Sequence, residues 1–163
     1  MQPFDDVVAE HGPVVMRVCR ALLGPADADD AWSETFLAAL RAYPDLGPGS
    51  NVRGWLVTIA HHKAIDVLRG AQRRPRPTDD LPEAAAADGI GAPPDDDLRA
   101  ALAALPPKQR GAVVYRYLAD LSYAAVGDLI DSNEAAARRS AADGIATLRR
   151  TYQRADHPRG TNR

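Results

Sequence analysis

The residue types that could support catalysis are concentrated in the segment IAHHKAID, which contains His61, His62 and Asp66. His62 and Asp66 are four residues apart, so on a helix they share one face and could both contact a metal ion. Two ligands do not complete a metal site, and His11 and His157 lie in no ligand-like pattern. The commoner alternative is a polar helix face in which Asp66 bonds to a neighbouring basic or backbone group.

Other patterns that enzymes use are missing from the sequence. Cys19, the single cysteine, lies in an apolar segment without an adjacent histidine, and we expect a small core residue there. The sequence has no glycine-rich phosphate loop and no nucleophile elbow, so we expect neither a catalytic site nor a cofactor. It also lacks a signal-peptide pattern and an apolar run of membrane-spanning length, which predicts a cytoplasmic protein without membrane insertion.

Basic and aromatic side chains occur together between Arg53 and Arg76, with Trp55 near the start. Lysine and arginine contact phosphates, and aromatic rings stack on unpaired bases, so this combination suits nucleic-acid binding. The alternative is a tryptophan in the core beside a solvated helix end, and for Trp55 the sequence favours the core.

Carboxylates gather between Asp27 and Glu34, beside the aromatic residues Trp32 and Phe36. A helix lined with carboxylates repels DNA, whereas it suits a basic or mixed protein surface. The alternative is a solvated helix face without a partner.

The net charge of −2 is unevenly distributed along the chain. Residues 77–97 carry seven acidic and no basic side chains, whereas residues 98–163 carry eleven basic and six acidic ones. The acidic stretch is rich in proline, glycine and alanine, and a coil of about 22 residues reaches about 70 Å when extended. We therefore predict a first domain over 1–76, a flexible acidic linker over 77–96, a second domain over 97–152 and a flexible tail over 153–163.

The first domain is expected to be entirely helical, because no segment alternates convincingly at a period of two. An apolar stripe over 7–22 predicts one helix, interrupted near Gly12-Pro13 and stopped at Gly24-Pro25. A second helix is expected to begin at the N-cap Asp27, and a third to run from about Val52 to Arg69. In the second helix we expect three apolar side chains to face inward: Phe36, Leu37 and Leu40.

The second domain is also predicted to be helical. Asp97 is expected to cap its first helix, and Pro106-Pro107 to end that helix and open the next. The stretch DLSYAAVGDLIDSNEAAARRSAADG then predicts a helix-turn-helix: Ser122 caps a helix over 123–130, residues 131–133 form the turn, and the last helix extends to about Arg150. Gly144 lies inside that last helix, at a cost of about 1 kcal/mol relative to alanine.

Two stretches resemble the extracytoplasmic-function (ECF) group of bacterial sigma factors. DADDAWSETFLAALRAY followed by NVRGWLVTIAHHKAIDVLR is similar to region 2, whose pattern is approximately DAEDLVQETFL and then WLYRIARNLAIDLLR. LAALPPKQRGAVVYRYLADLSYAAVGDLI is similar to the start of region 4, usually LPELPREVFLLRYVEGLSYEEIAEIL. The resemblance covers roughly residues 5–70 and 97–150. It implies an all-α protein of two small helical domains, a region 2-like bundle and a region 4-like helix-turn-helix.

The function that the resemblance implies is that of a dissociable subunit that gives RNA polymerase core its promoter choice. Such a subunit directs promoter recognition and transcription initiation without bond-making chemistry of its own. Its partners would be polymerase core, promoter DNA and, in many members of the group, an anti-sigma factor.

The resemblance also implies roles for individual residues. The acidic helix would dock on a coiled coil of the largest polymerase subunit through Asp27, Asp30, Glu34, Thr35 and Phe36. The following loop and third helix would hold the melted −10 element through Ser50, Asn51, Arg53, His61, His62, Lys63 and Arg69. The helix-turn-helix would read the −35 element through Tyr123, Ser132, Glu134, Ala137, Arg138 and Arg139.

This sequence departs from the family pattern in both DNA-reading parts. His61-His62 stands where arginine and asparagine are usual, and histidine loses its charge near neutral pH. The last helix, EAAARRSAADGIATL, has only Arg138 and Arg139 where the family has GTVKSRLHRARARL. We expect Arg138 to contact a base edge and Arg139 a phosphate. The alternatives are a sigma-like interaction module that reads DNA weakly, and an unrelated helical DNA-binding repressor or metal enzyme.

Overall fold

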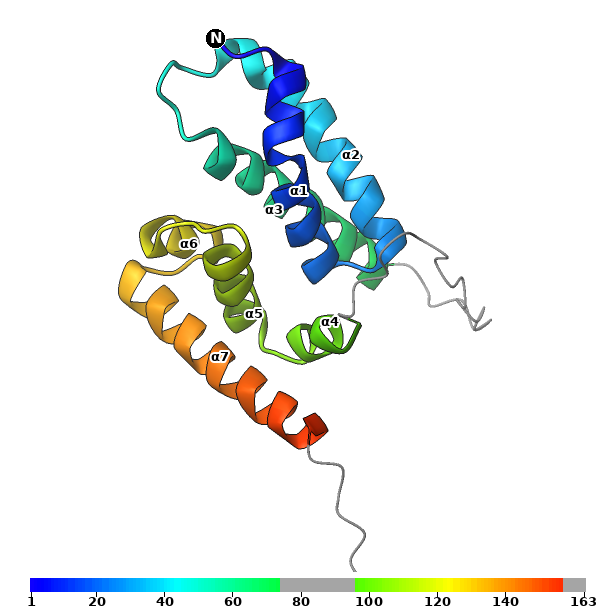
Figure 1. Cartoon of the computed structure of the whole chain (residues 1–163), viewed down its shortest axis with the longest axis vertical. Helices are drawn as coiled ribbons and strands as arrows, with labels where there is room; N and C mark the ends of the chain where they lie inside the picture. The colour runs from blue at the N-terminus through cyan, green and yellow to red at the C-terminus, as the bar shows by residue number, and fades with distance from the viewer. Residues whose placement is uncertain (74–95, 157–163) are drawn as a thin grey trace, which may run out of the picture.

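The computed structural model describes residues 1–73 and 96–156, and the regular elements of these residues are all helices (Figure 1). The predicted all-α fold is therefore confirmed. The predicted linker lies, apart from residue 96, outside the described residues, and so do residues 157–163 of the predicted tail.

Three helices form the N-terminal half: α1 (Phe4–Leu22), α2 (Pro25–Ala42) and α3 (Val52–Arg73), with a short 3₁₀ turn at Tyr43–Asp45. Each helix packs against the other two, as the upper part of Figure 1 shows. Their shared core consists of Val7, Val15, Cys19, Leu23, Ala28, Ala31, Phe36, Ala39, Leu56, Ala60 and Ala64. The prediction that Cys19 is a core residue is confirmed, and burial raises the pKa of its thiol to about 11.

Two predicted details of α1 and α2 are wrong. Helix α1 continues through Pro13 without interruption, and the indole Nε1 of Trp32 donates a hydrogen bond to the Gly12 carbonyl at 3.0 Å. Packing of α2 against α1 at this point stabilises the proline-containing turn. Helix α2 begins at Pro25 with Gly24 as N-cap, because proline at the first helical position needs no amide partner, and Asp27 lies in the first turn instead.

The inward face of α2 also differs from the prediction at Leu37 and Leu40, each of which is 51% exposed. Small residues at 28, 31, 35 and 39 form the buried stripe, at the three- and four-residue spacing of one helix face. Phe36 lies beside that stripe and is buried as predicted, whereas Leu37 points about 200° away from Thr35.

The C-terminal half contains α4 (Asp96–Ala103), α5 (Pro107–Val113), α6 (Tyr123–Leu129) and α7 (Glu134–Asp156). Pro107 opens α5, as predicted. The single helix expected after it instead widens into a π-helical turn at Val114–Leu118, where Tyr115 is buried. Helix α4 begins one residue before the predicted cap Asp97, and α7 extends to Asp156 rather than to Arg150.

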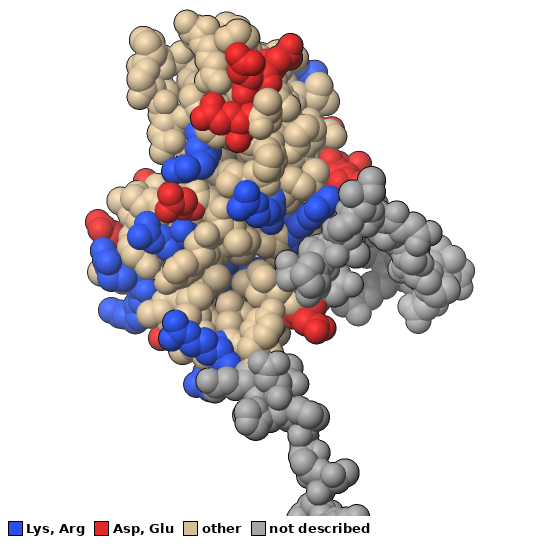
Figure 2. Space-filling view, viewed as in Figure 1, with Lys and Arg blue, Asp and Glu red and all other residues tan. Residues whose placement is uncertain are grey.

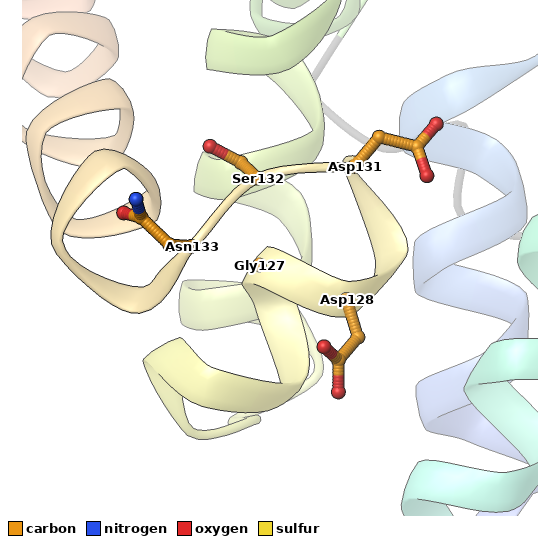
Figure 3. Close-up of a pocket in the computed structure, with 5 residues that line it drawn as sticks. All are labelled: Gly127, Asp128, Asp131, Ser132 and Asn133. Carbon is orange, nitrogen blue, oxygen red and sulfur yellow. The ribbon is translucent and has the colours of Figure 1, made fainter.

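The helix-turn-helix has the predicted cap at Ser122 and the predicted turn, and Asn133 adds a second cap. Ser122 Oγ accepts a hydrogen bond from the Ala125 amide, and Asn133 Oδ1 accepts one from the Ala136 amide at 2.7 Å. Asp131 makes the turn with a φ of 54°, a conformation that aspartate tolerates. A Cβ at Gly127 would lie 2.8 Å from the Ser132 carbonyl oxygen, so glycine allows the close approach of α6 to the turn (Figure 3).

The two halves pack against each other in the structure. Val18 of α1 and Val57 of α3 belong to the same buried cluster as Leu102, Leu105 and Tyr115 of the C-terminal half. Helix α1 contacts α4 and the π-helical turn, and α3 contacts α6. The sequence suggested two modules that reach separate sites, whereas the described residues form one continuous body (Figure 1).

Candidate nucleic-acid and polymerase interfaces

Arg138, near the start of α7, is held in place by two neighbours. Its guanidinium group lies 4.5 Å from the centre of the Tyr123 ring, and its Nη2 lies 3.3 Å from Glu134 Oε1. Arg116 stacks on the same ring at 4.6 Å and donates a hydrogen bond to the Leu121 carbonyl oxygen. The structure thus brings together three predicted −35 residues, Tyr123, Glu134 and Arg138. No signal in the sequence linked Arg116 to them, because its contact depends on the π-helical turn.

The other predicted −35 residues have different environments. Ala137 is fully buried, so in this structure its side chain is not available for the predicted contact with the −35 element. Its side chain faces the core because α7 packs against α5 and α6 on that side. Arg139 is exposed, and Ser132 is half-buried in the turn that precedes α7 (Figure 3).

Charge on the visible face is unevenly distributed between the two halves. Figure 2 shows most lysine and arginine side chains of this face in the lower half, over α4–α7, and the largest acidic group over the N-terminal part of α1. A basic surface around α7 favours phosphate contacts. The net basic character that the sequence indicated for the C-terminal half therefore appears on the surface.

The predicted −10 residues lie along the start and one side of α3. Asn51 Oδ1 accepts a hydrogen bond from the Gly54 amide at 3.1 Å, so Asn51 caps α3, and Ser50 Oγ donates one to the Gly47 carbonyl. His62 and Arg69 are exposed, and Lys63 is half-buried. Trp55 is also half-buried and packs on the N-terminal core, in the position that the sequence favoured.

Two further predicted −10 residues contact the C-terminal half. His61 Nδ1 lies 2.5 Å from the hydroxyl of Tyr115, and Arg53 Nη2 lies 3.7 Å from Asp120 Oδ2. Burial, followed by the charge of His62, lowers the pKa of His61, and burial raises the pKa of Tyr115. Both shifts favour a neutral imidazole that accepts the hydrogen bond of the tyrosine hydroxyl.

A cleft of about 580 Å³ separates α3 from α6 beside these contacts. Its walls combine polar and apolar side chains from both halves, among them Asn51, Trp55, His61, His62, Leu121 and Asp128. Residues of both predicted DNA-reading parts therefore border one cleft.

The predicted polymerase-docking residues do not share one surface. Asp27, Asp30 and Glu34 are exposed on α2, whereas Thr35 and Phe36 are buried. Thr35 Oγ1 donates a hydrogen bond to the Ala31 carbonyl oxygen at 2.6 Å, so the hydroxyl proton is already used within α2. The prediction that Thr35 and Phe36 contact a partner is wrong for this conformation, because both side chains pack inside the N-terminal half.

Residues 1–73 and 96–156 contain neither a cluster of metal-binding side chains nor a membrane-spanning helix. No group of three histidine, cysteine, aspartate or glutamate residues there is arranged to hold a metal ion. No helix in the described part of the chain has the length and apolar character needed to span a membrane.

Comparison with known proteins connects both halves to one family. Residues 7–74 match the model for Sigma-70 region 2, and residues 95–155 match a model for Sigma-70 region 4. The RNA polymerase sigma factor CarQ of Myxococcus xanthus is 33% identical over 153 residues, which cover 90% of this chain and 87% of CarQ. The ECF RNA polymerase sigma factor SigE of Mycolicibacterium smegmatis is 34% identical over 140 residues, 78% of this chain but only 52% of SigE, so the chain spans about half of that relative.

The fold also matches solved structures. Sigma factor RpoE of Bartonella quintana, solved in complex with the anti-sigma factor NepR, aligns with a TM-score of 0.75 at 18% identity, covering 92% of this chain and 96% of RpoE. Both halves, in the order in which the sequence places them, therefore have counterparts in sigma factors. The chain belongs to the ECF group of RNA polymerase sigma factors, which direct promoter recognition and transcription initiation.

Proposed function

We propose that this sigma factor docks on polymerase core through the exposed side of α2, reads the −10 element with α3 and reads the −35 element with α7. The observation that carries the proposal is the exposed stripe of Asp30, Glu34 and Leu37, which repeats at helical spacing on α2. Exposed leucines are unusual on a face without a partner, and two of them, Leu37 and Leu40, flank the carboxylates.

The α2 surface suits a partner that offers both positive charge and an apolar patch. Asp27, Asp30 and Glu34 supply the charge, and Leu37 and Leu40 supply the apolar area. We define these five residues as the α2 docking surface. The two leucines take the place of Thr35 and Phe36 of the predicted set. Thr35 and Phe36 are buried, so they pack α2 against the core instead of contacting a partner.

For the −35 element we propose different roles for Arg138 and Arg139. Tyr123 and Glu134 fix the guanidinium group of Arg138, and a fixed guanidinium group is suited to paired hydrogen bonds with a guanine edge. Arg139 is exposed on the adjacent side of α7, about 100° away, and is suited to a phosphate. With few basic contacts, the salt dependence of binding is expected to be shallow.

For the −10 element we propose contacts through α3 and the loop before it, on the side that carries His62, Lys63 and Arg69. Histidine and Trp55 can stack on unpaired bases, and the cations can contact the backbone. Ser50 and Asn51 contribute through the loop geometry and the cap of α3.

The proposed function also implies that this chain is a non-catalytic subunit and that it acts in the cytoplasm, together with its polymerase. It also makes an anti-sigma factor an expected further partner, because RpoE, which shares the fold, was solved with NepR bound. No residue of the described part is assigned a bond-making role.

The decisive experiment is transcription in vitro with core polymerase on a library of genomic fragments. Defined start sites that depend on this chain would support the proposal. Binding to core without initiation would instead favour a sigma-like interaction module, and no binding to core would contradict the proposal.

A further inference from the structure

Arg116 connects the π-helical turn to the start of α6. It lies within the turn at Val114–Leu118, and its Nη1 donates a hydrogen bond to the carbonyl oxygen of the buried Leu121 at 2.9 Å. Its guanidinium group also lies 4.6 Å from the centre of the Tyr123 ring, and the residue is half-buried. A backbone acceptor and an aromatic ring therefore hold Arg116 in one position at the corner before α6.

Arg138 is held less firmly by its own helix. The residue is exposed, and its ion pair with Glu134 joins two side chains that are 61% and 59% exposed. Solvent and salt screen such a pair, so it restrains a long side chain only weakly. The guanidinium group of Arg138 also lies 4.5 Å from the centre of the Tyr123 ring. Its position therefore depends mainly on where that ring lies.

The ring of Tyr123 joins the two arginines. Like charges repel, so two guanidinium groups gather around one ring only where something attracts both of them. An aromatic ring does so, because its faces carry partial negative charge. Tyr123 is the first residue of α6 and only half-buried, so burial alone does not fix its ring. The contacts thus run from the anchored Arg116 through Tyr123 to the exposed Arg138.

We propose that Arg116 is a positioning residue for recognition of the −35 element: it holds the ring of Tyr123, and the ring holds the guanidinium group of Arg138 in the orientation that binds a base. The proposal rests on the proposed contact of Arg138 with a base edge. It goes beyond that contact, because Arg116 acts on base preference without touching a base. A phosphate contact by Arg116 would instead strengthen binding to every sequence alike.

The main variant is Arg116→Gln. Glutamine removes the cation but keeps an amide that can donate to the Leu121 carbonyl oxygen, so the turn should still fold. Arg116→Lys is the conservative variant, because lysine keeps both a cation for the ring and a donor for the carbonyl. The matched control is Arg150→Gln, which removes the same charge from an exposed arginine of α7 that donates to Thr147 instead.

Transcription is compared on templates of one mapped promoter in which each −35 base is substituted in turn. In Arg116→Gln holoenzyme, preference should fall about two- to five-fold at the same base position that Arg138→Ala affects, as expected for loss of one contact between a cation and a ring. Arg116→Lys should keep most of the preference, and Arg150→Gln all of it. A purely structural role of Arg116 would lower activity on every template without changing the preference.

The position of Arg138 can also be followed without DNA. The Nε–H signal of its guanidinium group in an NMR spectrum senses the nearby ring, and it is assigned by its absence from Arg138→Ala. Arg116→Gln and Tyr123→Leu should both move this signal toward that of a freely moving arginine, whereas Arg150→Gln should leave it in place.

Each result decides a separate point. An unmoved Arg138 signal in Arg116→Gln would overturn the proposal, and so would an equal loss of transcription on all templates. Unchanged base preference in Arg138→Ala would show that the proposed −35 contact itself is wrong, and the role of Arg116 would fall with it.

Discussion

The guanidinium group of Arg138 lies over the ring of Tyr123, 4.5 Å from its centre, and Arg116 lies 4.6 Å from the centre of the same ring. This arrangement orients the exposed Arg138 near the start of the alanine-rich helix α7. A recognition helix with only two arginines near its start can still select a DNA sequence if one guanidinium group is held in position. Such a group loses little conformational entropy when it binds a base edge.

Arg138→Ala should impair promoter use while leaving binding to core polymerase unchanged. Loss of a bidentate base contact is expected to cost about 1–3 kcal/mol and to relax preference at one position of the −35 element. Transcription from templates with each −35 base substituted measures both effects. Arg139→Ala is the matched control, and it should weaken use of all templates uniformly; the same position-specific loss in both variants would contradict the division of roles.

Glu34→Lys should weaken binding to polymerase core, because it reverses one charge of the α2 docking surface. Leu37→Ala should do so as well by removing exposed apolar area, at a cost of about 1 kcal/mol. Asp29→Lys is the control, since Asp29 is exposed but points about 140° away from Glu34 around α2. Titration of the labelled chain with core polymerase gives the affinities. Equal affinities of the three variants would contradict the assignment of the α2 docking surface.

Gly144→Ala should destabilise the protein, although alanine is the better helix former. A Cβ at Gly144 would lie 2.6 Å from Val113 Cγ2 and 3.3 Å from the Gln109 carbonyl oxygen, where α7 crosses α5. We expect a loss of about 1–3 kcal/mol in the free energy of unfolding, as is typical of overpacking.

The control for that variant is Gly70→Ala, because a Cβ at Gly70 meets nothing within 4 Å. That substitution should stabilise by about 0.5–1 kcal/mol through helix propensity. Urea denaturation of both variants measures the difference, and a stabilising Gly144→Ala would show that α5 and α7 separate more easily than the structure indicates.

Lowering the pH should weaken the contact between the two halves at His61 and Tyr115. Burial and the neighbouring His62 lower the pKa of His61 below 6.5, while the carboxylate of Asp131 opposes them, so His61 binds fewer protons when the two halves are packed together. The contribution of His61 to this packing is therefore complete above pH 6.5 and is lost as the pH falls through its lowered pKa.

Energy transfer between two dyes, attached to cysteines introduced as Ala9→Cys on α1 and Ala142→Cys on α7, reports this change when it is recorded from pH 8 to pH 5.5. Transfer should fall toward the acid end in the wild type, and the fall should be smaller in His61→Asn. In His62→Asn the fall should remain but move to higher pH, because the charge of His62 helps to lower the pKa of His61. A pH response that persists unchanged in His61→Asn would contradict the assignment of the titration to His61.

The sequence by itself determined the helices, their order and the family. Those features depend on local signals: the cap at Ser122, the proline that opens α5, the turn at Asp131 and the apolar spacing that makes every element helical. Each signal acts through atoms only a few residues apart along the chain, so it can be read without knowing the fold.

The tertiary structure alone decided which side of each helix is available. Leu37 and Leu40 have the same chemistry as core residues, and only the packing of α2 on α1 and α3 leaves them exposed. Packing likewise buries Ala137. The contact between His61 and Tyr115 joins residues 54 positions apart through a π-helical turn that no pattern in the sequence predicted. Burial is a property of all neighbours in space, whereas the sequence lists only neighbours along the chain.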